Sequence, residues 1–234
     1  MIRRVRRMSV VMRVMHWLLA LSVAVCFVTG VYIGTPGWLR PPGWGPADAL
    51  VMGNVRFVHF VFAMLVDVAF LVWFYLFFFS RETPFVRSLV PFGPRLREAW
   101  QMLRHYFTMR NKPSTREPHI DPLNAYGFLM IHVLVFVQMV TGFALMYPTF
   151  SHANSLVPLW PWILGLAERA SVSVFGTIVV VRQVHHVAAF LIVALAMIHI
   201  YLQIWRDAFW TEGHISVVVS GYKYIEEDEP APPA

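Results

Sequence analysis

Residues 178–205 read IVVVRQVHHVAAFLIVALAMIHIYLQIW. An apolar run of this length crosses the roughly 30 Å hydrocarbon core of a bilayer when it forms a helix. The run nevertheless contains Arg182, His185, His186 and His199. A charged or titratable side chain at membrane depth costs about 2.5 kcal/mol or more, so it usually marks a functional site. The stretch therefore predicts a transmembrane helix that carries such a site.

The spacing of the histidines indicates what kind of site this is. His185 and His199 are 14 residues apart, which on an α-helix is about 1400°, about 40° short of four full turns, with a rise of roughly 21 Å. Both imidazoles therefore leave one face of the helix, one near each membrane surface, as two stacked metal centres on a shared helix require. His186 lies about 100° around the helix from His185 and is the weaker candidate.

The composition as a whole is that of an integral membrane protein. The chain has 234 residues, of which 58% are hydrophobic and 14% charged, and its mean hydropathy is +0.58, whereas soluble domains are less apolar. Four stretches are long and apolar enough to span a bilayer: residues 14–34, 55–79, 124–147 and 177–205. The first is too long for a signal peptide and lacks a small-residue cleavage pattern, so we expect it to remain as a helix.

The distribution of Lys and Arg predicts the orientation of these spans. Residues 1–13 hold five of them, the 81–122 loop holds eight, and the tail from Arg206 holds two. The opposite loops and the adjoining helix starts hold only Arg40, Arg56, Arg169 and Arg182. Because cytoplasmic loops are enriched in Lys and Arg, both termini are expected in the cytoplasm. The net charge of +6 is then a topology signal, and nucleic acid is not an expected partner.

The cysteine content and the motifs exclude several classes of cofactor. Cys26 is the single cysteine of the chain, which excludes a cysteine-ligated iron–sulfur cluster, a four-cysteine zinc site and an intrachain disulfide. The sequence has no C-x-x-C-H motif, so any haem is bound without thioether links. It also has no G-x-G-x-x-G or P-loop pattern, and nucleotides are not expected.

Two further histidines complete two pairs. His16 opens the first span at its cytoplasmic end, at the depth of His199 in the fourth span, and His59 opens the second span at the opposite surface, level with His185. A lone histidine in a membrane helix is more often a hydrogen-bond partner of another helix. Two imidazoles from facing helices, however, are how a low-spin b-type haem is held in a bundle core. We therefore predict the axial pairs His16 with His199 and His59 with His185.

Arginines accompany the predicted iron ligands. Arg13, Arg56 and Arg182 each precede a ligand by three residues, an internal R-x-x-H repeat. Arg206 lies seven residues beyond His199, where the helix leaves the membrane in the other direction, and is about 20° off the same face. Since Arg offers carboxylates charge-assisted, bidentate hydrogen bonds, these four residues are the predicted partners of the haem propionates.

Three other residues inside the spans have less certain roles. Gly30 lies 14 residues after His16, at the depth of the other haem, where a missing side chain leaves room for the macrocycle; helix packing through small residues explains it nearly as well. Asp67 is either a proton-relay group or, more simply, a hydrogen-bonded structural acid. His132 has no partner at its depth and is interpreted as a hydrogen-bonded core histidine.

The segments between the spans also carry patterns. Residues 94–107 place an apolar stripe beside arginines, which predicts an amphipathic helix at the membrane interface. The polar residues 110–121, which include His119, form either one wall of a cytoplasmic quinone site or a solvated loop. The outer connection, residues 148–176, is expected on the membrane surface because of its tryptophans. Taken together, we predict an all-α, integral membrane four-helix bundle holding two stacked b haems, with residues 1–225 as one domain and the acidic, Pro-rich residues 226–234 as a disordered tail.

These motifs match a known family over nearly the whole chain. The matching segments are His16-Trp17, His59, Arg182 to His186, His199-Ile200-Tyr201 and Ser220-Gly221-Tyr222-Lys223. With them the chain resembles the b-type cytochrome subunit of membrane-bound nickel–iron hydrogenases, within a wider group that includes formate dehydrogenase gamma subunits and bacterial cytochromes b561. The tail motif favours the hydrogenase branch. The resemblance implies haem ligands at the four paired positions, and a histidine at the position of His186 that is not a ligand.

The resemblance also implies the function and its setting. It implies a multi-pass subunit of the bacterial cytoplasmic (inner) membrane that relays electrons from the iron–sulfur small subunit and the nickel–iron large subunit of a periplasmic hydrogenase to menaquinone or ubiquinone. The chain lacks ligands for hydrogen activation, so it is expected to transfer electrons and to be a possible host for quinone reduction. The alternatives are a formate dehydrogenase or thiosulfate reductase cytochrome, a stand-alone di-haem quinone oxidoreductase and a haem-free, histidine-lined transporter.

Overall fold

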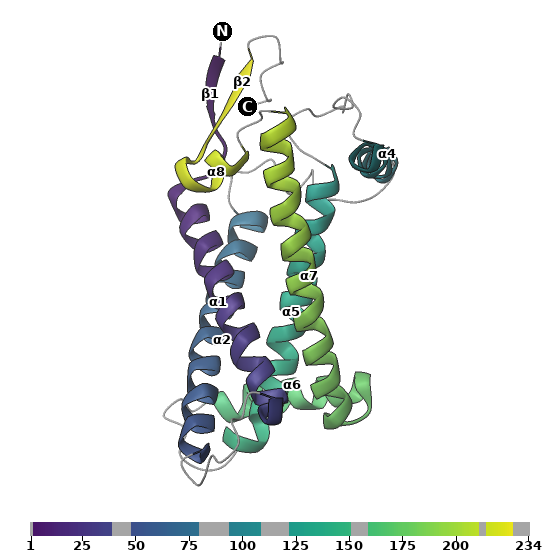
Figure 1. The fold of residues 1–234 in the computed structure, drawn as a ribbon. Helices are drawn as coiled ribbons and strands as arrows, with labels where there is room; N and C mark the ends of the chain where they lie inside the picture. The colour runs from purple at the N-terminus through teal and green to yellow at the C-terminus, as the bar shows by residue number, and fades with distance from the viewer. Residues whose placement is uncertain are drawn as a thin grey trace. The chain divides into compact units, whose positions relative to one another are not determined.

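The computed structural model is helical apart from one small sheet (Figure 1). It describes residues 2–38, 48–79, 94–108, 122–150, 159–210 and 214–226. The predicted quinone-site segment, residues 110–121, and residues 227–234 of the predicted tail lie outside the described residues. Glu226, which was predicted to begin that tail, is the last residue of a β-strand instead.

Four long helices account for the predicted spans. They are α1 (Val10–Gly34), α2 (Asp48–Phe79), α5 (Pro122–Phe150) and α7 (Ile178–Trp210). Within the described part of the chain these are the helices long and apolar enough to cross a membrane. The prediction of four spanning helices is confirmed, and most of them extend beyond the predicted bounds because hydropathy marks only the hydrocarbon-facing part of a helix. α5 begins at Pro122, whose fixed φ suits the first helical position.

The outer faces of these helices are apolar. Large hydrophobic side chains that remain exposed occur along all four of them, among others Leu21, Val28, Phe57, Leu71, Phe136, Phe190 and Ile200. Soluble monomers rarely expose extended apolar surfaces, whereas the lipid-facing surface of a membrane protein must be apolar. The chain is therefore a multi-pass membrane protein.

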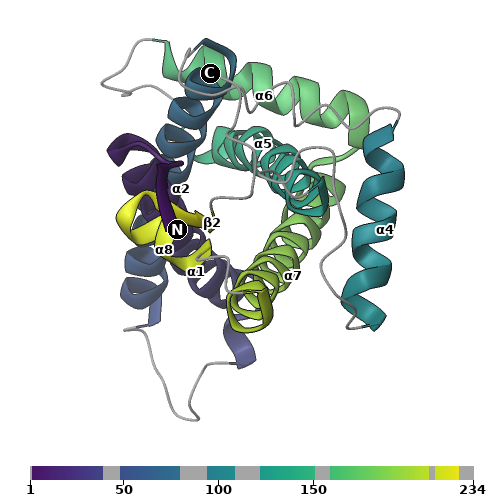
Figure 2. The same ribbon diagram turned by 90° about the horizontal axis from the view of Figure 1, so that it is seen from above.

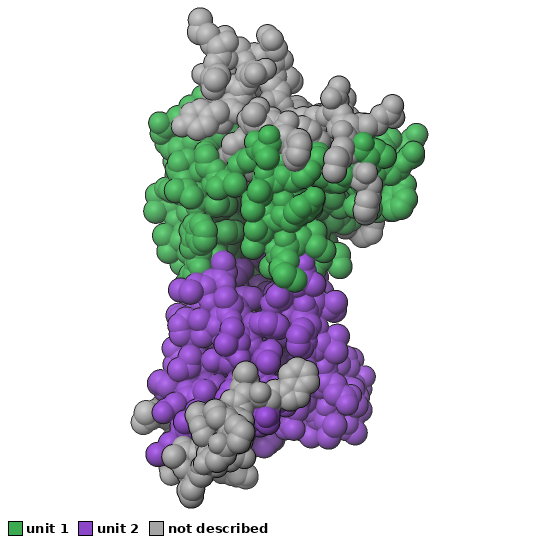
Figure 3. Space-filling model, in the orientation of Figure 1, with its two compact units in different colours: residues 1–18, 71–131, 195–234 green, residues 19–70, 132–194 purple. Residues whose placement is uncertain are grey.

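The chain divides into two compact units (Figure 3). Unit 1 comprises residues 1–18, 71–131 and 195–234, and unit 2 comprises residues 19–70 and 132–194. Each long helix contributes one segment to each unit. The two predicted histidine pairs fall in different units, since His16 and His199 belong to unit 1 and His59 and His185 to unit 2.

Unit 2 contains a four-helix bundle. The rings of Phe27 on α1 and Phe190 on α7 are 5.2 Å apart, and those of Phe70 on α2 and Phe136 on α5 are 6.3 Å apart. Hydrogen bonds described below join α1 to α2 and α5 to α7, so the four segments close a ring, as the view in Figure 2 shows. The core is consequently enclosed by all four helices.

The outer connection, predicted only to lie on the membrane surface, contains a helix. α6 (Trp160–Phe175) begins with Pro161 in its first turn and ends at Gly176, whose φ is +86° and whose amide donates to the carbonyl of Val172. Trp160 packs edge-on against Phe143 of α5 at 5.5 Å. A helix forms here because proline and glycine delimit sixteen residues of largely apolar sequence.

Unit 1 contains the sheet, which the all-α prediction did not include. β1 (Ile2–Arg6) pairs antiparallel with β2 (Tyr222–Glu226). The short helix α8 (His214–Ser220) leads into β2 through Gly221, which has a φ of +87°. A Cβ at Gly221 would lie 2.7 Å from the carbonyl oxygen of Met8, so only glycine fits there. The amphipathic helix predicted from residue 94 is confirmed as α4 (Pro94–Thr108).

Candidate functional site

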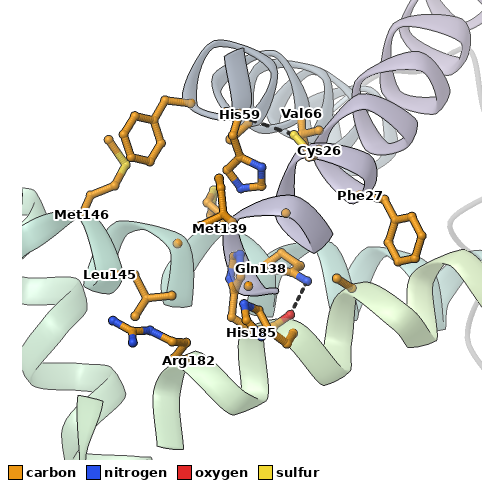
Figure 4. A pocket seen from close by; sticks show the side chains of 18 of the residues that line it. Cys26, Phe27, His59, Val66, Gln138, Met139, Leu145, Met146, Arg182 and His185 are labelled. Atoms are coloured by element: carbon orange, nitrogen blue, oxygen red, sulfur yellow. Dashed lines mark hydrogen bonds between the residues drawn. The ribbon is translucent and has the colours of Figure 1, made fainter. Parts of the chain in front are cut away.

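A cavity of about 580 Å³ lies in the core of unit 2 (Figure 4). Its lining comes from all four bundle helices and includes the five residues predicted for the outer haem site: Gly30, Arg56, His59, Arg182 and His185. The structure thus brings the predicted outer site together in one cavity. Its volume is within the range of ordinary cofactor pockets, about 300–1,000 Å³.

The His59 side chain reaches this cavity from α2 and is held by α1. Its Nδ1 lies 2.9 Å from the hydroxyl oxygen of Thr29. The Sγ of Cys26 lies 3.7 Å from the backbone carbonyl oxygen of His59 and donates to it. His59 is therefore fixed at both its ring and its backbone by one neighbouring helix.

The His185 side chain reaches the cavity from α7 and is held by α5 in the same way. Its Nδ1 lies 2.9 Å from the hydroxyl oxygen of Thr141, and the Nε2 of Gln138 donates to the backbone carbonyl oxygen of His185 at 2.7 Å. Figure 4 shows this bond, with His59 and His185 facing the same cavity. The sequence analysis did not identify Thr29, Thr141 or Gln138.

Glycines leave room for the histidine rings. A Cβ added at Gly30 would lie 3.3 Å from Cε1 of His59, and one at Gly142 would lie 3.5 Å from Cε1 of His185. Gly30 was predicted to make space for the macrocycle; the structure shows that it borders the imidazole of a predicted ligand. A Cβ at Gly34 would approach Cε1 of His186 to 2.9 Å. The approaches at Gly30 and Gly34 are too close for a Cβ unless the histidine ring shifts, whereas the distance at Gly142 is an ordinary contact.

The remaining candidates of unit 2 occupy different positions. Arg56 and Arg182 line the cavity and are exposed, and neither forms an ion pair with an acidic side chain among the described residues. His186 and Asp67 also line the cavity. His132 does not, and its ring lies 6.0 Å from that of Phe70. The last observation agrees with the interpretation of His132 as a core residue.

Unit 1 contains the second predicted pair. His16 and His199 are both partly buried there. The Nδ1 of His16 is buried and has no hydrogen-bond partner in the structure. Arg13, predicted to bind a propionate, donates through its guanidinium to the carbonyl of Val219 in α8, while Arg206 is 2% exposed. The tail motif at residues 220–223 thus adjoins the helix that holds His16.

The residues present fit haem as a ligand. Each pair offers two imidazoles, which are the usual axial donors for low-spin haem in helical bundles. In unit 2 they face a cavity enclosed by four helices, with two arginines in its lining. In unit 1 the buried Nδ1 of His16 has no hydrogen-bond partner in the structure, which is uncommon for a buried polar atom. These features define the class of membrane-bound b-type cytochromes.

Comparison with known proteins gives the family. The chain belongs to the prokaryotic cytochrome b561 family, whose sequence profile matches residues 7–221. It is 29% identical to a probable Ni/Fe-hydrogenase B-type cytochrome subunit of Rhodobacter capsulatus, over 92% of this chain and 80% of that protein. It is 30% identical to a protein of the same name from Azotobacter vinelandii, over 94% of this chain and 88% of the relative. The probable Ni/Fe-hydrogenase 1 B-type cytochrome subunit of Escherichia coli K12 is 27% identical over 90% of this chain.

Proposed function

We propose that this chain is the membrane-anchoring cytochrome b subunit of a nickel–iron hydrogenase, and that it holds two b haems. One lies between His59 and His185 and the other between His16 and His199. The observation that carries the proposal is the cavity of unit 2, which His59 and His185 face from different helices. Relatives named as hydrogenase cytochrome subunits, similar over at least nine tenths of this chain, support the choice of partner.

The residues of each site have distinct tasks. The four histidines would hold the haem iron through a ring nitrogen, and Arg56 and Arg182 would bind the propionates at the membrane boundary. Bound at these positions, haem supplies one-electron transfer between a hydrogenase and a quinone. Since α7 carries one histidine of each pair, a single helix contributes to both sites.

The orientation follows from the charged residues. The arginine-rich segments, residues 1–13 and 81–122, favour a cytoplasmic location for both termini. His59 and His185 are then on the outer side of the bacterial inner membrane. The iron–sulfur small subunit and the nickel–iron large subunit would dock on that side, and menaquinone or ubiquinone would accept electrons in the membrane.

Purification from native membranes in mild detergent tests the proposal. We expect a sharp reduced α-band, about two haems per chain, and co-purification of a nickel–iron subunit with an iron–sulfur subunit. Isolation of the chain without haem would contradict the cytochrome assignment and favour a histidine-lined transporter. Co-purification with a formate dehydrogenase or thiosulfate reductase instead would keep the cytochrome assignment and overturn the choice of partner.

A further inference from the structure

Two five-residue segments of unit 2 share a sequence pattern. Residues 26–30 read CFVTG on α1, and residues 138–142 read QMVTG on α5. Each segment faces one histidine of a neighbouring helix, His59 on α2 or His185 on α7. We call these two segments the clasps. The same set of contacts therefore occurs twice in unit 2, once around His59 and once around His185.

Each clasp contacts its histidine at three points. The first residue, Cys26 or Gln138, donates to the histidine's backbone carbonyl. The fourth residue is a threonine whose hydroxyl meets Nδ1 at 2.9 Å in both clasps. The fifth is a glycine at which a Cβ would lie 3.3 or 3.5 Å from Cε1 of the ring. The first contact fixes the backbone of the histidine's helix, the second fixes the hydrogen bond of Nδ1, and the third limits where the ring can lie.

The hydrogen bonds of the two threonines indicate which ring nitrogen carries the proton. The hydroxyl of Thr29 donates to the carbonyl of Val25 at 2.7 Å, and the hydroxyl of Thr141 donates to that of Val137 at 2.6 Å. A hydroxyl has one hydrogen and two lone pairs. With the hydrogen used by the carbonyl, the oxygen accepts from Nδ1–H of the histidine. The other ring nitrogen, Nε2, is then the unprotonated one.

We propose that Thr29 and Thr141 are positioning residues that keep His59 and His185 in the Nδ1–H tautomer and thereby present Nε2 to the haem iron. This inference rests on the proposed function, because it assigns the ligating atom of two predicted ligands. A hydrogen bond to the outer nitrogen of a ligating histidine fixes the ring and makes it a stronger donor. The clasps therefore stabilise the oxidised iron relative to the reduced iron at this site.

Substitution of the threonines tests the proposal in the haem-loaded chain. Thr29→Val and Thr141→Val keep the shape and remove the acceptor, so the midpoint potential of the unit 2 haem should rise. A tenfold change in the relative affinity of the site for oxidised and reduced haem corresponds to about 59 mV for one electron. Thr29→Ser and Thr141→Ser, which keep the hydroxyl, should restore the original midpoint.

Thr108→Val is the matched control. Thr108 ends α4 and donates to the carbonyl of Arg104 at 2.9 Å, the same i to i−4 bond as in the clasps, and it does not line the cavity. Its substitution should leave both midpoints unchanged. Equal shifts in Thr108→Val and Thr29→Val, or no shift in either clasp variant at full haem content, would overturn the clasp proposal and leave the proposed function standing.

A second measurement reads the tautomer directly. Nitrogen-15 spectra of the haem-free full-length chain in nanodiscs should show His59 and His185 protonated at Nδ1, and each valine substitution should mix the tautomers of its own histidine only. Protonation at Nε2 in the unsubstituted chain would overturn the proposal. This measurement also distinguishes failure of the cytochrome function from failure of the clasp proposal. A chain that never acquires haem would contradict the cytochrome function, whereas the tautomers of His59 and His185 would still test the role of the clasps.

Discussion

The two histidine pairs are supported by different parts of the protein. In unit 2, His59 and His185 are each held by a threonine from a neighbouring membrane helix. In unit 1, the buried Nδ1 of His16 has no hydrogen-bond partner. The residues next to His16 in α1 bind the C-terminal segment instead: Trp17 donates through Nε1 to the carbonyl of Val218 at 3.0 Å. The unit 2 pair is thus held by hydrogen bonds within a helical bundle, whereas in unit 1 the described hydrogen bonds to the C-terminal segment come from Arg13 and Trp17, the neighbours of His16.

This difference indicates that the two sites should respond differently to perturbation. Bonds that lie partly buried between apolar helices have less access to water that could replace a lost partner than exposed bonds do, so their removal costs more. The bonds of Arg13 and Trp17 to α8 carbonyls are exposed, and water substitutes for them more readily. Loss of a single part-buried hydrogen bond in unit 2 should therefore cost more than loss of a single exposed hydrogen bond in unit 1.

The largest expected effect is the loss of one haem. His185→Ala should remove the unit 2 haem and His199→Ala the unit 1 haem, each halving the haem content of the purified chain, because an axial ligand is lost. His132→Ala should keep both haems, since this residue lies outside the cavity. Haem per chain by the pyridine haemochrome method measures all three. Loss of both haems in a single ligand variant would show that the two sites are not independent.

The glycines provide the next largest effect. Gly221→Ala combines a positive φ with a Cβ 2.7 Å from a backbone oxygen, and we expect a loss of about 1–3 kcal/mol in the stability of unit 1. Gly30→Ala must displace the His59 ring by a few tenths of an ångström, whereas Gly142→Ala makes an ordinary contact at 3.5 Å. Thermal release of the unit 2 haem, followed spectroscopically, should occur at a lower temperature in Gly30→Ala than in Gly142→Ala. The reverse order would contradict the described ring positions.

The arginines of the cavity should have a smaller effect. Arg56→Ala and Arg182→Ala should lower the midpoint potential of the unit 2 haem, because a cation near the propionates favours the more negative, reduced centre. Both arginines are exposed, so solvent screening should hold the change to about 1 kcal/mol or less. Redox titration of both variants measures the effect. Unchanged midpoints at full haem content would mean that these arginines serve only to anchor the helix ends.

The smallest effect concerns the sheet of unit 1. The guanidinium of Arg4 lies 3.6 Å from the centroid of the Tyr222 ring and, through its hydrogen bond and charge, lowers the pKa of the exposed Tyr222 phenol. A lowered pKa in the folded state adds stability to the sheet as the pH rises through that pKa, and this contribution is lost as the pH falls below it. Arg4→Ala should move the phenol back toward its usual pKa in an ultraviolet titration. An unchanged titration curve would show that the pairing is absent in solution.

The sequence by itself determined the four spans, and it predicted the grouping of the histidines. Hydropathy and helical phase are properties of one element at a time, so the apolar runs identified α1, α2, α5 and α7, and the 14-residue spacing assigned His185 and His199 to different sites. The amphipathic pattern from residue 94 identified α4 for the same reason. The repeated Val-Thr-Gly was visible in the sequence as well, although nothing in it showed which side chains the threonines meet.

Only the tertiary structure decided the contacts between elements. The threonines meet His59 and His185 because of the rotation of each helix about its axis, which packing sets and no single segment encodes. The sheet joins residues 2–6 to residues 222–226. These short strands lie at opposite ends of the chain, and no local sequence pattern predicts that they pair. The membrane helices follow from the preference of their own residues for lipid, whereas the surroundings of the histidines follow from which neighbours the fold brings within hydrogen-bond distance.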